Sequence, residues 1–142
     1  MIREHAEAIL ALLRTAPGTT PLVVLDGVVP TDPATGKSQL PPYVLVYFAD
    51  SDPEDADSRS AEDTPGRYVV WAYCHCVGGN ADAARKIGDR VRTVLLGAAP
   101  VVAGRSCFPI RREDGSPPGR DESTGALVMD KVDVYRLASE PA

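Results

Sequence analysis

Apolar residues recur every three to four positions at the start of the chain. Between residues 2 and 15 they fall on one stripe of a helix, at Ile2, Ala6, Ile9, Leu10 and Leu13. This spacing predicts an amphipathic helix whose apolar side packs against the rest of the protein. The helix should end at residues 16–18, Ala-Pro-Gly, because proline cannot continue the hydrogen-bond ladder.

Three β-rich segments follow this helix. Residues 21–30 predict a short strand with a turn at Asp26-Gly27. Residues 43–50 and 67–77 are apolar at both odd and even positions, so both faces of each strand should be buried. Such strands belong in the middle of a sheet, and we expect both to be central. Residues 50–66 between them predict a long exposed loop, since they hold seven acids and one arginine.

A second helix is predicted after Gly78-Gly79. The Asn80 side chain can accept a hydrogen bond from the first free N–H groups, and Gly97 can end the helix in a left-handed conformation. The predicted buried stripe comprises Ala84, Ile87, Val91, Val94 and Leu95.

The C-terminal third predicts two further strands, at residues 100–112 and 125–137. A polar connection separates them and a short tail follows, so they resemble a long hairpin. The element order predicts an α+β fold. We expect a mixed, mainly antiparallel sheet, two helices packed on one face, a long C-terminal hairpin, and a single domain over residues 1–142.

Composition narrows the classes of function. The net charge is −5, which disfavours a general nucleic-acid binder. No apolar run approaches the length needed to span a bilayer, and residues 1–5 do not resemble a signal peptide, so we expect synthesis in a cytosol. Three cysteines in such a chain do not suggest a disulfide framework.

The most suggestive chemistry lies at Cys74, His75 and Cys76. Successive residues of a strand point to opposite faces, so His75 cannot join the two thiols around one metal ion or serve as their base. We therefore expect the two cysteines to fill the core. His75 should share the other face with Trp71 and Tyr73, and we expect a helix to cover that face.

Two loops resemble ligand-binding motifs only in part. The segment ending in Gly36-Lys37-Ser38 has Thr31 where a phosphate-binding loop needs glycine, and no helix can follow it. The acidic loop lacks the central glycine and final glutamate of an EF-hand. No catalytic, metal or cofactor motif remains, so we expect a binding or assembly protein rather than an enzyme.

Two groups of charged residues are candidates for contacts between subunits. The acidic group contains Asp50, Asp52, Glu54, Asp55 and Asp57. The basic group contains Arg105, Arg111, Arg112 and Arg120. Their opposite charges would suit a contact between the arginines of one copy and the acidic loop of a neighbouring copy.

In layout, the chain resembles the tail terminator, or tail completion, proteins of long-tailed bacteriophages. The resemblance covers nearly the whole chain and rests on the order of "AEAILALLRT", "VVLDGVVP", "PPYVLVYF", "RYVVWAYCHCVGG", "ADAARKIGDRVRTVLLG", "PVVAGR" and "DVYRL". It implies a non-enzymatic virion protein at the tail–head junction. It also implies a six-membered ring that caps the tail tube, stops tube polymerisation and meets the neck.

The implied partners are further copies of the chain, the major tail tube protein and a neck or head-completion protein. DNA would pass through the ring without specific binding, and no membrane would be involved. We also expect some acidic loops to line the channel, because carboxylates repel phosphates. Alternative functions are a head-closure or stopper ring, a related component of a prophage or contractile injection particle, or a small enzyme or ligand-binding domain whose pocket is lined by Trp71, Tyr73 and His75.

Overall fold

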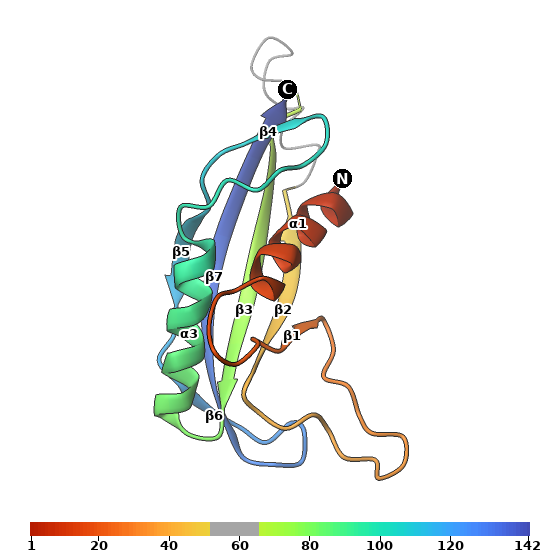
Figure 1. The fold of residues 1–142 in the computed structure, drawn as a ribbon, viewed down its shortest axis with the longest axis vertical. Coiled ribbons are helices and arrows are strands. Elements are labelled where there is room, and N and C mark those ends of the chain that lie inside the picture. Colours follow the sequence, from red (N-terminus) through yellow and green to blue (C-terminus); the bar gives the residue numbers. More distant parts are fainter. Residues whose placement is uncertain (52–65) are drawn as a thin grey trace.

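The computed structural model describes residues 1–51 and 66–142, which form two helices and one curled sheet. The helices are α1 (Ile2–Arg14) and α3 (Ala81–Leu95). The strands are β1 (Val24–Asp26), β2 (Tyr43–Asp50), β3 (Tyr68–Gly78), β4 (Arg105–Cys107), β5 (Arg111–Gly115), β6 (Gly119–Asp121) and β7 (Val128–Pro141). Both helices lie on the same side of the sheet (Figure 1). The predicted α+β class is confirmed.

The sheet is built around its three longest strands. Its order is β1-β2-β3-β7-β4, and β5 and β6 also pair with β7. Among the strands of residues 1–51 and 66–142, only β1 and β2 run parallel, and the other pairings are antiparallel. The predicted central positions of β2 and β3 are therefore confirmed, and Gly27, with φ of 71°, ends β1 at the predicted turn.

The main core lies between the sheet and the helices. Helix α1 contributes Ile9, Leu10 and Leu13, and the sheet contributes residues such as Val46 and Leu137. Helix α3 begins as predicted, because the Asn80 side-chain oxygen accepts a 2.8 Å hydrogen bond from the Ala83 N–H. Four of its five predicted stripe residues are buried and the fifth packs against them: Ala84, Ile87, Val91, Leu95 and Val94.

The turn from β3 into α3 requires glycine at position 78. A Cβ there would lie 2.5 Å from the backbone nitrogen of Ala84, too close for any side chain. Gly97 then follows the helix with φ of 82°, as predicted. Strand β3 and helix α3 are thus joined by a tight turn that requires glycine at position 78.

The C-terminal hairpin exists, but its first arm is not the single strand predicted over residues 100–112. That arm is divided into β4, β5 and β6, all antiparallel to β7. Pro109 has no N–H for the ladder, and Ile110 instead donates a 2.8 Å hydrogen bond to the carbonyl oxygen of Ala98 after α3. The chain is thereby pulled from the sheet towards the helix.

The predicted tail at residues 138–142 is also wrong, because β7 continues to Pro141. Ser139 is fully buried and pairs with Cys107 and Tyr68 on the two neighbouring strands. The polar residues of "ASEPA" concealed this strand. In residues 1–51 and 66–142, no helix has the length and apolar character needed to cross a membrane.

Candidate interaction surface

Strand β3 divides its side chains between the two faces of the sheet. Cys74 and Cys76 point towards the helices and are fully buried. His75 points to the other face, where its Nδ1 lies 2.8 Å from Oδ2 of Asp130. The predicted divergence of the three side chains is confirmed. No group of three or more metal-ligating side chains forms in the described part of the chain.

The buried thiols are poor nucleophiles. Burial raises the pKa of Cys74 to about 12, and the nearby Asp133 carboxylate adds to this shift. Burial likewise raises the pKa of the Cys76 thiol. Because a thiolate is the reactive form, neither cysteine can attack a substrate at neutral pH.

Among residues 1–51 and 66–142, no helix covers the face that carries His75, so the expected covering helix is absent from the described part of the chain; we call this face the open face. Both described helices pack on the cysteine side (Figure 1). At the β1 end of the open face, Tyr43, Leu45 and Val77 are buried and form a second small core with Val128, against which Leu25 and Val29 pack. Further along, Tyr47 and Tyr73 are 44% and 38% exposed.

Trp71 lies beside these tyrosines on the open face. Its indole Nε1–H donates a 3.0 Å hydrogen bond to Oε2 of Glu113. Glu113 is the additional residue of a β-bulge in β5, between Arg112 and Asp114, which directs its side chain to this face. The Trp71 ring at the centre of the open face is thus held in place by a neighbouring side chain.

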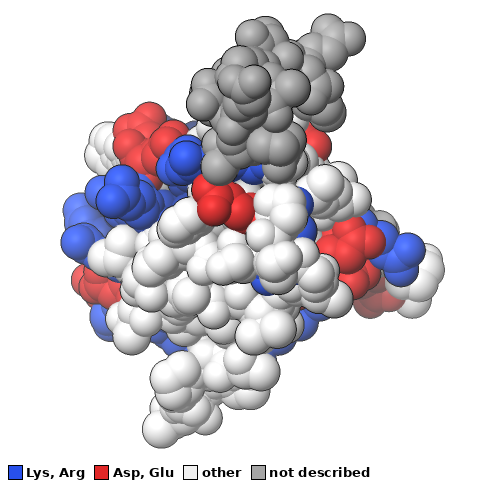
Figure 2. All heavy atoms as spheres, turned by 90° about the horizontal axis from the view of Figure 1, so that it is seen from above, with Lys and Arg blue, Asp and Glu red and all other residues white. Residues whose placement is uncertain are grey.

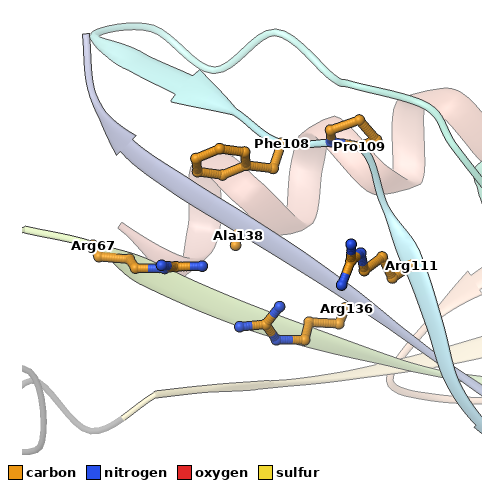
Figure 3. A pocket seen from close by; sticks show the side chains of 6 residues that line it. All are labelled: Arg67, Phe108, Pro109, Arg111, Arg136 and Ala138. Atoms are coloured by element: carbon orange, nitrogen blue, oxygen red, sulfur yellow. The ribbon is translucent and has the colours of Figure 1, made fainter.

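At the β4 end, the open face carries a pocket of about 270 Å³. Its lining residues are Arg67, Phe108, Pro109, Arg111, Arg136 and Ala138. Arg136 lies on β7, Arg111 pairs with it from β5, and Arg67 directly precedes β3. Figure 3 shows the three guanidinium groups turned towards the space beside the Phe108 ring.

The pocket is strongly cationic. The guanidinium carbon of Arg67 lies 5.7 Å from the centre of the Phe108 ring, a cation–π arrangement. Arg136 has a carboxylate 3.6 Å away, Oε1 of Glu113. Within residues 1–51 and 66–142, Arg67 and Arg111 have no carboxylate partner. Basic side chains also gather on one side of the molecule when it is viewed from this end (Figure 2).

Of the four arginines predicted as subunit contacts, only Arg111 lies in this pocket. Arg105 donates to the Ser139 hydroxyl and to the backbone oxygens of Ser139 and Gly66. Arg112 is paired with Asp133 at 2.8 Å, a hydrogen bond that raises the pKa of Arg112. Arg120 lies 3.5 Å from the exposed Glu122. The sequence analysis missed Arg67 and Arg136. Arg67 is four residues from Trp71 and Arg136 is two residues from Val134, and this even spacing indicated that each arginine shares the open face with its neighbour.

Of the predicted acidic residues, Asp50 ends β2 and accepts a hydrogen bond from the Tyr68 hydroxyl. Burial and this hydrogen bond raise the pKa of Tyr68. Asp50 therefore joins β2 to β3. The other four predicted acids lie outside the described residues: Asp52, Glu54, Asp55 and Asp57.

A buried charge network on the helix side was not predicted. The Asp133 carboxylate is 3% exposed, and its Oδ1 lies 2.8 Å from Arg112 and 2.6 Å from Lys131. Two cations compensate the buried carboxylate, as a desolvated charge requires. The alternation of side chains along residues 129–137 indicates that β7 has two faces. It does not indicate which residues lie next to the Asp133 carboxylate.

A buried serine–histidine pair was also not predicted. Nδ1 of His5 donates to the Met1 carbonyl oxygen, so its Nε2 accepts from the Ser139 hydroxyl, both at 2.8 Å. Both residues are fully buried, and Arg105 also donates to the same hydroxyl. No substrate can reach this pair, and the contact instead anchors α1 to β7.

The fold is similar to that of a chain in a solved structure described as "Virion of native gene transfer agent (GTA) particle". The TM-score is 0.57 and the sequence identity is 20%, and the match covers 93% of this chain and 84% of that chain. No protein-family model and no curated protein matches the sequence. At this identity the likeness establishes a shared fold.

Proposed function

We propose that this chain is a structural component of a phage-like virion. The observation that carries the proposal is the fold shared with a chain of the gene transfer agent particle over 93% of the residues. More specifically, six copies would form a ring that caps the tail tube, stops its polymerisation and joins it to the neck, as the order of the sequence elements suggests.

The surface of the chain supports an assembly role. Trp, Tyr and Arg are the residue types that contribute most to protein–protein binding energy, and the open face carries all three. The two described helices, α1 and α3, leave its centre and its arginine pocket uncovered. The partners would be neighbouring copies of the chain, the tail tube protein and a neck protein.

The internal chemistry supports a non-catalytic role. The cysteines with raised pKa values and the serine–histidine pair are enclosed in the core. An enzyme needs such groups within reach of a substrate. The described residues are therefore better suited to binding another protein than to catalysing a reaction.

Electron microscopy of the purified protein, alone and mixed with growing tail tubes, tests the proposal. We expect rings at one end of each tube and tubes that stop lengthening; tubes without the protein serve as the control. Rings that bind isolated neck complexes but never tube ends would instead indicate a head-closure protein. Quenching of Trp71 fluorescence by a small metabolite, with no binding to tubes or necks, would favour the ligand-binding alternative.

The channel-lining hypothesis for the acidic loop has its own test. If the loop lines the channel instead of contacting a neighbouring subunit, reversing Asp52, Glu54, Asp55 and Asp57 to lysine should leave rings that form but retain DNA, because phosphates would be attracted to the wall. We expect slower DNA ejection and a lower infectious titre. A variant that assembles and ejects DNA at the normal rate would exclude this role.

A further inference from the structure

The arginine pocket has the composition of a site for carboxylates. We propose that it receives the acidic segment, residues 50–63, of a second copy of the chain. This inference rests on the proposed ring, and it specifies how one subunit binds the next. It replaces the predicted basic group by Arg67, Arg111 and Arg136.

The geometry favours a carboxylate-bearing peptide. A guanidinium group can donate two parallel hydrogen bonds to one carboxylate, and here three such groups border one space. Phe108, Pro109 and Ala138 supply an apolar wall for the adjoining aliphatic carbons. A volume of about 270 Å³ suits one or two acidic side chains.

The charge distribution favours a second copy as the source. Residues 50–63 contain seven carboxylates and one arginine, whereas Arg67 and Arg111 have no carboxylate partner among the described residues. A ring needs two different complementary surfaces on each subunit, and these two satisfy that requirement. Nucleic acid fits less well, because the chain is acidic overall and Glu113 lies beside Arg136.

Charge reversal in two separate variants tests this contact. The pocket variant carries Arg67→Glu and Arg111→Glu; the segment variant carries Asp52→Lys, Glu54→Lys, Asp55→Lys and Asp57→Lys, which makes the segment net positive. Each alone should fail to form rings, because like charges would meet at every contact. An equimolar mixture should form alternating rings, since each acidic surface again meets a basic one.

A matched control carries the same number of charge reversals on the helix side. Arg85→Glu and Arg92→Glu lie on exposed positions of α3 and should leave ring formation unchanged. Circular dichroism and thermal melting check that every variant is folded. Normal rings from the folded pocket variant alone, or no rings from the mixture, would overturn the proposed contact while leaving tube capping by the wild-type protein intact.

A peptide assay keeps the test independent of the ring. A fluorescein-labelled peptide of residues 50–63 should bind the wild-type protein, and Arg67→Gln with Arg111→Gln should weaken this binding by about tenfold. The affinity should fall with added salt. Equal affinity of both proteins for the peptide would refute the pocket, and tighter binding of single-stranded DNA would identify it as a nucleic-acid site.

Discussion

The two faces of the sheet treat polar groups differently. On the helix side, Asp133, His5 and Ser139 are buried, and each is held by partners from other elements. On the open side, Tyr47 and Tyr73 remain exposed and the pocket arginines border an open space. The first face stabilises the subunit, and the second has the character of a surface that another molecule completes.

This difference separates stability from assembly. Substitutions of buried residues on the helix side should destabilise the subunit, and substitutions on the open side should leave it folded but unable to associate.

Truncating a core residue on the helix side should have the largest effect on stability. Leu137→Ala removes a fully buried side chain from the middle of β7 and leaves a cavity between the sheet and the helices. We expect the free energy of unfolding to fall by about 3 kcal/mol, measured by denaturant titration. A loss below about 1 kcal/mol would mean that this face is loosely packed.

Neutralising the buried carboxylate should have the next largest effect. Asp133→Asn keeps the shape of the side chain but leaves Arg112 and Lys131 without a counter-charge. We expect a loss of about 2 kcal/mol in the same titration. Arg120→Gln, which removes only an exposed pair, should change stability by less than about 0.5 kcal/mol and serves as the control.

An alkaline titration should reveal the buried thiols. The folded pKa of Cys74 is about 12, above the ordinary value of 9.0, so the unfolded chain loses its proton first. The stability contributed by the protonated thiol is therefore complete below pH 9 and lost as the pH rises towards 12. Cys74→Ala should reduce the slope of this part of the stability–pH curve, and the remaining slope would come from groups such as Cys76 and Tyr68, whose pKa values are also raised. An unchanged curve would contradict the shifted pKa of Cys74.

Removing an aromatic ring from the open face should change subunit stability least. We expect Tyr73→Ala to lower the free energy of unfolding by less than about 1 kcal/mol, because the ring is partly solvated. Ring formation, followed by analytical ultracentrifugation with tail tubes or alone, should nevertheless be lost. A folded variant that still assembles would show that the centre of this face takes no part in the interface.

The sequence pattern predicted the elements whose signals are local. The stripe from Ile2 to Leu13, the Asn80 cap and the two-faced strands each follow from spacing that a short window contains. The division of residues 100–115 could not be predicted in this way. It depends on Ile110 bonding to Ala98, a contact that exists only after the helix has packed on the sheet.

The candidate site was predicted only in part for the same reason. Charge and sequence position identified Arg111 as exposed, but they did not separate it from Arg105 and Arg112, which bind within the chain. Arg67 and Arg136 join Arg111 only because β3, β7 and β5 are neighbours in the sheet. Strand order is a property of the whole chain, which no local pattern contains.

Strand β7 pairs with β3, β4, β5 and β6, so most of the sheet depends on one segment near the C-terminal end of the sequence. Its partner β3 is separated from it by α3 and three short strands. Closing so distant a pair is slow compared with forming helices or local turns. Before β7 pairs with it, β3 has an apolar, unpaired edge that can bind another partly folded chain. We therefore expect the refolding yield to rise at low protein concentration, because partly folded chains then meet rarely.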